Sequence, residues 1–356
     1  MEILLRKAKI DYELTVLVVI LTIFGLFILK SAVYSENIEV LFKKQIIWDL
    51  VGFSLFILIV FFNFNSLISY FPALYVFSVI MLIGLFFFGE RISGAIRWYN
   101  FPVGSFQPSE FAKISTIGFL GIILKNKGLK NFILSMIVMV IPAALVILEP
   151  DLGTAIVFFI IWFVMIWVGN FNKKYIMGVI LILSVMIPLF FFFGLKDYQR
   201  ARILSFLNPN AYKYNEAYHL IQSIRTVGSG GLSGRGYMRG PSNLYGYLPA
   251  DHTDFIFAVL AEELGFLGTT SLIILYLLLY FKIYRIFKKT VFEEQKLIIS
   301  GIFAMIAMHS IQNIGMNLGL LPITGLPLPF FTYGGSSTIF FFLSLGLIHN
   351  ISVKLQ

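Results

Sequence analysis

The chain has no cysteine and only four histidines in 356 residues. The lack of cysteine excludes disulfides, thiolate nucleophiles and cysteine-ligated metals. The histidines, at 219, 252, 309 and 349, do not stand at the spacing of metal ligands. A Walker A sequence is also absent, so an ATP-driven pump is not expected. Charge is scarce as well, because Asp, Glu, Lys and Arg together make up 13% of the residues.

Hydrophobic residues dominate instead, at 58% of the chain with 39 Phe and a mean hydropathy of +0.88. Uncharged runs of about 18 or more residues are long enough to span a bilayer as helices. Such runs occupy 50–89, 131–148, 152–172, 175–195, 264–281 and 297–353, and two weaker spans cover 14–33 and 108–124. The runs 50–89 and 297–353 each fit two spans. We therefore expect an all-α polytopic integral membrane protein with about ten transmembrane helices, forming a single domain over 1–356.

Lys and Arg set the expected orientation. Most of those near the helix ends fall on the side that holds the N-terminus: Arg6, Lys7, Lys9, Lys125, Lys127, Lys130, Lys173, Lys174, Lys282, Arg285, Lys288, Lys289, Lys296 and Lys354. Fewer fall in the short segments on the other side: Lys30, Lys43, Lys44, Arg91 and Arg97. The positive-inside rule then places both termini in the cytoplasm and a large loop, 196–253, outside, between helices 7 and 8. The net charge of +9 needs no nucleic acid to explain it.

Carboxylates that border hydrocarbon are costly and need a reason to be there. The stretch DHTDFIFAVLAEELGFLG places Thr253 and Asp254 at the start of helix 8, with Asp251 just before it in the loop. Asp254 is the first candidate for chemistry at the membrane surface, although an acidic residue there also suits the helix dipole. His252 is close enough to assist it. Glu262 and Glu263 follow eight and nine residues later, about 12–14 Å deeper along a continuous helix.

These two glutamates need partners inside the protein. Lys113 is one candidate, and backbone at a helix break near Gly265 or Gly268 is another. Lys113 also stands three residues after Glu110 in FQPSEFAKI, so the two share a helix face. This pair fits either a structural salt bridge or the charged lining of a substrate cavity.

The outer loop is rich in arginine and glycine. Arg200, Arg202 and Arg235, with the segment GSGGLSGRG, suit a phosphate or diphosphate, although arginines at this level also anchor to lipid headgroups. The later segment LGLLPITGLPLPFFTYGGSS is irregular and uncharged. Its Tyr333, Ser336 and Ser337 offer hydrogen bonds to a polar substrate, or form a structural turn.

Three smaller expectations concern buried polar groups. Asp151 in LEPDLGTAIV is expected to cap the helix that follows it. His309 and His349 are expected to be buried hydrogen-bonding residues.

QPSEFAKI, PDLGTAIV, SGGLSGRG, HTDFIFAVLAEELG and LPLPFFTYGGSS occur here in the order found in the SEDS family. The resemblance spans roughly residues 90–350, and the GLPLPF wording is more similar to the RodA branch than to the FtsW branch. It implies a peptidoglycan glycosyltransferase of the bacterial cytoplasmic membrane that polymerises lipid II at the outer face for cell elongation and shape. It also implies a class B penicillin-binding protein as partner.

The resemblance carries site residues with it. The acidic residue of HTDFIF, here Asp254, is the family's catalytic residue, and Glu110 and Lys113 correspond to a functionally sensitive ion pair. The implied reaction is an inverting transfer. Asp254 acts as base on the 4-hydroxyl of an incoming lipid II, and the donor is a glycan on undecaprenyl diphosphate. Arginines or a divalent cation, Mg²⁺ or Mn²⁺, would stabilise the leaving group. The chain departs from the family at Asp251, where a Glu often stands nearby.

A lipid II flippase is the alternative from the transporter class, since it also needs a polar cavity in the membrane. The polar residues cluster in the expected outer half, however, and the sequence shows no inverted repeat of the kind many transporters have. A third hypothesis is a non-catalytic scaffold that activates its transpeptidase partner.

Overall fold

The computed structural model describes residues 10–35, 38–92, 95–101, 104–212, 217–248 and 250–355. All ten segments expected to cross the membrane are helical. They are α1 (Tyr12–Ser35), α2 (Glu39–Leu58), α3 (Phe64–Phe88), α4 (Pro108–Leu124), α5 (Leu129–Leu148), α6 (Leu152–Val168), α7 (Lys173–Leu189), α11 (Ile256–Lys289), α12 (Glu293–Asn317) and α13 (Gly335–Val353). Within the described ranges, seven helices are long and apolar enough to span a membrane, and α4, α6 and α7 have 17 residues each. The chain is a multi-pass membrane protein.

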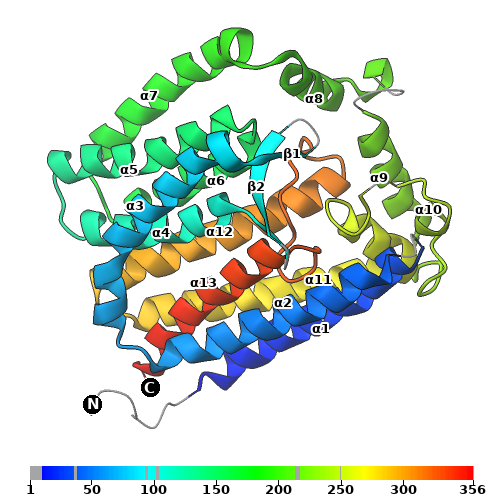
Figure 1. The fold of residues 1–356 in the computed structure, drawn as a ribbon, viewed down its shortest axis with the longest axis horizontal. Coiled ribbons are helices and arrows are strands. Elements are labelled where there is room, and N and C mark those ends of the chain that lie inside the picture. Colours follow the sequence, from blue (N-terminus) through cyan, green and yellow to red (C-terminus); the bar gives the residue numbers. More distant parts are fainter. Residues whose placement is uncertain are drawn as a thin grey trace.

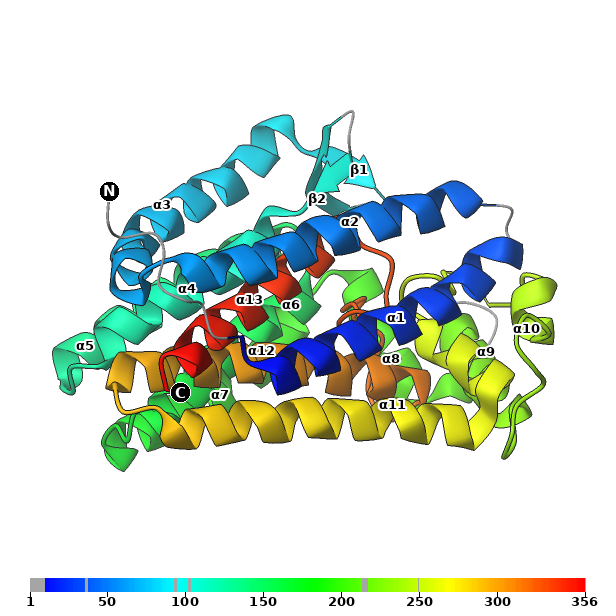
Figure 2. The same cartoon turned by 90° about the horizontal axis from the view of Figure 1, so that it is seen from below.

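The first and last membrane helices meet at one end of the bundle (Figure 2). The backbone N–H of Asp11, just before α1, donates to Nε2 of His349 on α13 at 2.9 Å. His349 is thus a buried hydrogen-bonding residue, as predicted. Lys282 on α11 forms ion pairs with Asp11 at 2.8 Å and Glu13 at 2.6 Å. These contacts join α1, α11 and α13, and they satisfy the charges of this cluster within the protein. Arg6, Lys7 and Lys9 lie outside the described residues.

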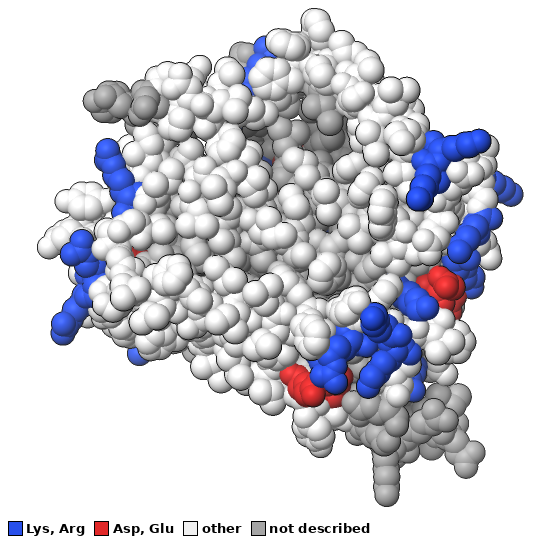
Figure 3. Space-filling model, turned by 180° about the vertical axis from the view of Figure 1, so that it is seen from behind, with Lys and Arg blue, Asp and Glu red and all other residues white. Residues whose placement is uncertain are grey.

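The centre of the bundle is formed by α12 and α13, whose side chains are mostly buried. The other helices surround them, and α7 lies apart from the rest (Figure 1). Exposed apolar side chains such as Leu181 on α7 and Phe87 on α3 face outward. Figure 3, which views the molecule from the side opposite to Figure 1, shows Lys and Arg gathered toward the two ends, with a broad uncharged band between them. This band is the surface expected to contact lipid.

One element was not predicted. Between α3 and α4 the chain forms a three-stranded antiparallel sheet from β1 (Glu90–Ile92), β2 (Ala95–Phe101) and β3 (Gly104–Phe106), with strand order β1-β2-β3. Tyr99 on β2 anchors the sheet, since its hydroxyl donates to the carbonyl of Met81 on α3 at 2.8 Å. The strands are too short to bury a face of their own. The all-α prediction therefore holds for the bundle and missed this small sheet.

The large loop 196–253 is also more ordered than its description as a loop suggested. It begins after a π-helical turn, η2 (Phe190–Gly194), and folds into short helices. They are α8 (Asp197–Leu207), η3 (Pro209–Tyr212), α9 (Tyr218–Ser229) and α10 (Pro241–Leu244). Figure 1 shows α8, α9 and α10 gathered at one end of the bundle. Short helices, and not an irregular loop, therefore cover this end of the bundle.

Helix α11 is broken at Gly265, which has φ +64° and ψ −159°. The glycine-rich segment packs against this break. The N–H groups of Arg235 and Gly236 donate to the carbonyls of Glu262 and Glu263 at 2.8 and 3.0 Å. A side chain at Gly234 would place its Cβ 2.1 Å from the Glu263 carbonyl oxygen. The glycines therefore allow close backbone packing at a helix break. The position of the break agrees with the one predicted near Gly265 or Gly268.

The break reverses the expected depth of the two glutamates. Glu262 accepts hydrogen bonds from the hydroxyls of Ser229 and Ser242, at 3.0 and 2.8 Å, both in the outer segment. Glu263 is bonded to the hydroxyl of Ser31, near the end of α1. The prediction that they lie deeper than Asp254 is wrong, because it assumed a continuous helix. The suggested pairing with Lys113 is also wrong.

Replacing Gly265 with Ala should destabilise the fold by about 2–3 kcal/mol, because an L-residue at positive φ is strained. The added Cβ would also stand 2.3 Å from the N–H nitrogen of Gly234. The thermal unfolding midpoint of detergent-purified protein measures this loss. Gly178→Ala on α7 is the matched control, because a Cβ there meets nothing within 4 Å. Equal midpoints for the two variants would show that the break is not a strained junction.

Candidate active site

Asp254 lies in the turn that precedes α11. The helix itself begins at Ile256, two residues after the predicted start at Asp254. Its backbone carbonyl accepts hydrogen bonds from the side-chain amides of Asn313 and Asn317 on α12, at 3.2 and 3.1 Å. Asn317 also accepts from the N–H of Ala258 at 3.2 Å. The turn is thus held against the central helix, which fixes where the carboxylate projects.

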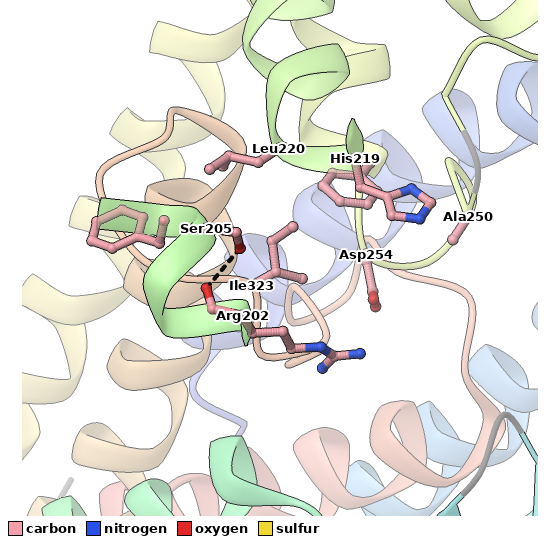
Figure 4. A pocket seen from close by; sticks show the side chains of 9 residues that line it. Arg202, Ser205, His219, Leu220, Ala250, Asp254 and Ile323 are labelled. Carbon is pink, nitrogen blue, oxygen red and sulfur yellow. Dashed lines mark hydrogen bonds between the residues drawn. The ribbon is translucent and has the colours of Figure 1, made fainter. Parts of the chain in front are cut away.

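The Asp254 side chain projects into a cavity of about 170 Å³. Short helices of the outer segment and two irregular loops line it: Arg202, Ser205, Phe206, His219, Leu220, Ala250, Asp254, Phe255 and Ile323. In Figure 4 the Arg202 guanidinium, from α8, and the Asp254 carboxylate extend into the same open space, with His219 above them. Among the described residues that line it, the cavity therefore offers one carboxylate, one permanent cation and one imidazole.

The surroundings perturb both titratable groups. Burial raises the pKa of Asp254, and the charges of Arg202 and then Arg97 act in the opposite direction. Burial, and then Arg202, lowers the pKa of His219, which favours its neutral form. A carboxylate whose pKa lies above the ordinary range is a better proton acceptor near neutral pH than a solvated one. The site thus combines a candidate base with a neutral hydrogen-bonding imidazole.

Arg97 is a site residue that the sequence did not reveal. It belongs to β2, and it pairs with the Asp151 carboxylate at 3.6 Å while donating to the carbonyls of Glu149 and Pro150. Burial, followed by the charge of Asp151, raises the pKa of Glu149 to about 9. The small sheet thereby brings a second guanidinium within electrostatic range of Asp254. In the sequence Arg97 contributes only to the distribution of positive charge, because the pattern does not predict the sheet that places it near Asp254.

Asp151 caps α6 as predicted. Its Oδ1 accepts from the N–H of Thr154 at 3.1 Å, and its Oδ2 accepts from the Thr154 hydroxyl at 3.0 Å. The ion pair with Arg97 is an additional role. Capping and charge pairing together hold the start of α6 next to strand β2.

Glu110 and Lys113 form the predicted ion pair at 2.8 Å, and both side chains are almost fully buried. Lys113 Nζ also lies 2.8 Å from Nε2 of His309 on α12. Neither Glu110 nor Lys113 is among the described residues that line the Asp254 cavity. The geometry therefore favours the structural-bridge interpretation over the cavity-lining one, and it makes His309 a buried hydrogen-bonding residue, as expected.

Of the three arginines expected to face a diphosphate, the structure brings only Arg202 to Asp254. Arg200 donates to the carbonyls of Phe191 and Phe192 and so closes the π-helical turn after α7. Arg235 donates to the carbonyl of Ser229 at 2.9 Å, within the glycine-rich segment. Neither Arg200 nor Arg235 is among the described residues that line the Asp254 cavity, so their contact with a diphosphate stays a prediction.

The residues of the TYGGSS segment are placed differently from one another. Ser336 donates to the carbonyl of Ser105 at 3.1 Å and accepts from the N–H of Gln107 at 3.0 Å, linking α13 to the chain before α4. Ser337 donates to the carbonyl of Gly334 at 3.2 Å. Both hydroxyls thus make hydrogen bonds within the protein, and their contact with a substrate stays a prediction.

Tyr333 stays close to the Asp254 turn. Its N–H donates to the carbonyl of His252 at 3.0 Å, and the two rings meet edge to face. His252 Nδ1 lies 3.2 Å from the buried carboxylate of Asp251. This carboxylate therefore orients the imidazole next to the Asp254 turn, which gives Asp251 a structural place in the site.

A divalent cation would find one carboxylate here. No cluster of three or more His, Asp or Glu with metal-binding geometry occurs among the described residues. Mg²⁺ often binds through one or two carboxylates plus substrate phosphates and water, so Asp254 alone is compatible with such a cation.

The comparisons with known proteins identify the family of the chain. A family model described as "Cell cycle protein", covering FtsW, RodA and SpoVE, matches residues 12–356. The peptidoglycan glycosyltransferase MrdB of Escherichia coli K12 is 35% identical over 284 residues, which cover 79% of this chain and 77% of MrdB. The peptidoglycan glycosyltransferase RodA of Treponema pallidum is 31% identical, covering 97% of this chain and 98% of that protein.

A solved structure is similar over its full length. One chain of a peptidoglycan synthase complex, described as coordinating polymerization and crosslinking, superposes with a TM-score of 0.85 at 29% identity, covering 97% of this chain and 98% of that chain. Family model, relatives and overall fold thus agree, and the chain belongs to the SEDS family of FtsW, RodA and SpoVE proteins, in its RodA branch.

Proposed function

We propose that this protein is a peptidoglycan glycosyltransferase that polymerises lipid II at the outer face of the bacterial cytoplasmic membrane, for cell elongation and shape. The observation that carries the proposal is the Asp254 carboxylate facing Arg202 in one cavity. The short helices α8 and α9 that contribute to this cavity lie at the end of the bundle away from the C-terminal end of α13 (Figure 1). Family membership supports the activity, and the distribution of Lys and Arg supports cytoplasmic termini.

The chemistry follows from the groups in the cavity. Asp254 takes the proton from the sugar 4-hydroxyl of an incoming lipid II as that oxygen attacks the anomeric carbon of the donor glycan. The bond that breaks leaves undecaprenyl diphosphate, on which negative charge accumulates. Arg202 and Arg97 are the cations in electrostatic range of Asp254 that would stabilise this charge. If a divalent cation takes part, Asp254 is the residue of this cavity that would hold it, and the cation would supply further stabilisation of negative charge.

The proposed partner is a class B penicillin-binding protein that crosslinks the strands made here. Support comes from the similar chain that was solved within a peptidoglycan synthase complex. Both lipid substrates would keep their undecaprenyl tails in the bilayer, next to the apolar surface of the bundle. Only the headgroups then need to reach the cavity beneath α8 and α9.

The direct test supplies purified protein, alone and with its transpeptidase partner, with labelled lipid II and measures glycan polymer. Polymer is expected from the wild type. If no well-folded preparation makes polymer and the protein instead moves lipid II headgroups across vesicle membranes, the result would favour the hypothesis that it is a lipid II flippase.

The pH dependence offers a second test. A base must be deprotonated, so kcat/KM should fall as pH drops through the raised pKa of Asp254. Arg202 lowers that pKa, so Arg202→Gln should raise it further and move the acidic limb of the profile to higher pH. Arg235→Gln is the matched control, since the described hydrogen bond of the Arg235 guanidinium goes to the backbone of Ser229 in its own segment, and the side chain does not line the cavity. An acidic limb that moves equally in both variants would contradict the assignment of Arg202 as the cation facing Asp254.

A further inference from the structure

A row of polar side chains on α12 holds one wall of the Asp254 cavity. Gln312 donates to the carbonyl of Pro322 at 2.7 Å, and Asn313 donates to the carbonyl of Leu326 at 2.9 Å. His309, one turn earlier on the helix, lies with Nδ1 3.2 Å from the carbonyl of Pro327. The segment 322–327 therefore has three attachments to α12.

This segment reaches the candidate base. Ile323 lines the cavity, and a Cβ built at Gly325 would stand 3.6 Å from the Asp254 Oδ2. Gly325 has φ +72°, a conformation that glycine adopts without strain. The position of 322–327 thus determines how closely protein surrounds the Asp254 carboxylate.

His309 differs from the other two attachments because it has a charged partner on its far side. A carbonyl can only accept, so the Pro327 contact requires a proton on Nδ1. In the neutral ring, Nε2 is then an acceptor, which matches Lys113 Nζ at 2.8 Å. Lys113 is in turn paired with Glu110 at 2.8 Å. The ring itself is held edge-on against Phe341, with centroids 5.1 Å apart.

We propose that His309 is a positioning residue that connects the buried Glu110–Lys113 pair to segment 322–327 and thereby sets the closure of the cavity wall over Asp254. The lysine fixes the tautomer and orientation of the ring, and the ring fixes the wall. This gives the buried ion pair a route to the reacting groups without contact with substrate. Only the polymerisation readout of this inference rests on the proposed function; the structural readout does not.

Two substitutions separate the two sides of the ring. A glutamine amide reaches about as far as Nε2, so His309→Gln keeps a partner for Lys113 and loses the Pro327 contact. An asparagine amide reaches about as far as Nδ1, so His309→Asn keeps the Pro327 contact and loses Lys113. Ser300→Ala is the control, because this buried α12 hydroxyl donates only to Leu297 of its own helix in the described contacts.

The first readout does not depend on activity. Coupling of Asp254 to an amine by a water-soluble carbodiimide, followed by mass spectrometry, reports access to its carboxyl. We expect His309→Gln to fold with a wild-type unfolding midpoint and to label about three- to tenfold faster, whereas Ser300→Ala labels at the wild-type rate. Labelling of His309→Gln at the wild-type rate would overturn the proposal, since the ring would then serve Lys113 alone.

The second readout is polymerisation of labelled lipid II. His309→Gln should lower kcat about three- to tenfold with little change in KM, because the loss lies in positioning and not in uniform substrate binding. Its acidic limb should move to lower pH, since a more solvated Asp254 loses part of the burial that raises its pKa. An unchanged kcat and pH profile would overturn the proposal. If the wild type makes no polymer but His309→Gln still labels faster than the wild type, the proposed function is refuted and the positioning role remains.

Discussion

Replacing Asp254 with Asn should lower the rate of lipid II polymerisation by about 10²–10⁴-fold, the range that a general base contributes. The amide keeps the shape of the carboxylate but accepts no proton from the sugar hydroxyl. The backbone carbonyl of Asp254, held by Asn313 and Asn317, is unaffected, so the turn and the fold should persist. Initial rates of polymer formation, normalised to folded protein, measure the effect.

Glu90→Gln is the matched control for this experiment, because Glu90 is an exposed carboxylate of β1 outside the cavity lining. We expect polymerisation within about twofold of wild type in that variant, as for most surface substitutions. A comparable fall in both variants would show that the loss follows from removing negative charge at this end of the molecule, and Asp254 would lose its assignment as the base.

Replacing Lys113 with Met should destabilise the protein by about 3–5 kcal/mol, because it leaves Glu110 as a buried charge without its cation. Lys113 is fully buried and bonded to both Glu110 and His309, so the deletion also removes a partner from the ring. This is a large part of the stability of a typical folded protein. Thermal unfolding in detergent and the yield of monodisperse protein measure the loss.

The chain offers a matched exposed pair as control. Lys125 and Glu294 also stand 2.9 Å apart, but the Lys125 side chain is 43% exposed and that of Glu294 21%. Solvent weakens such a pair, so Lys125→Met should change stability by less than about 1 kcal/mol. The double variant Glu110→Gln with Lys113→Met should recover part of the loss. Equal midpoints for Lys113→Met and Lys125→Met would show that the buried pair contributes no more than a surface pair.

The sequence predicted the bundle well because most of the membrane helices are encoded locally, as largely uncharged runs of sufficient length. The ion pair of Glu110 and Lys113 was equally predictable, since i and i+3 positions share a face whatever surrounds them. Asp254 was found because a carboxylate at the edge of hydrocarbon is rare. In each case the signal lies within a few consecutive residues.

The predictions that failed depended on contacts between distant segments. Arg97 reaches the Asp254 region only through a hairpin whose strands are too short to show a clear alternation. The glutamates at 262 and 263 were placed too deep because a single positive φ at Gly265 breaks the helix. The sequence does not distinguish Arg200 and Arg235 from Arg202, because all three are arginines of the outer segment. The fold of that segment determines which of them lies near Asp254. His219 carries no local signal that would place it above Asp254.

The most direct test of the central claim uses sealed proteoliposomes in which the Asp254 end of the protein faces outward, with labelled lipid II added to the outer leaflet alone. The account predicts glycan polymer on the outside of wild-type vesicles, none from Asp254→Asn, and no requirement for headgroup transfer to the lumen. Headgroup transfer that is equal in the two proteins, with no polymer from either, would contradict it.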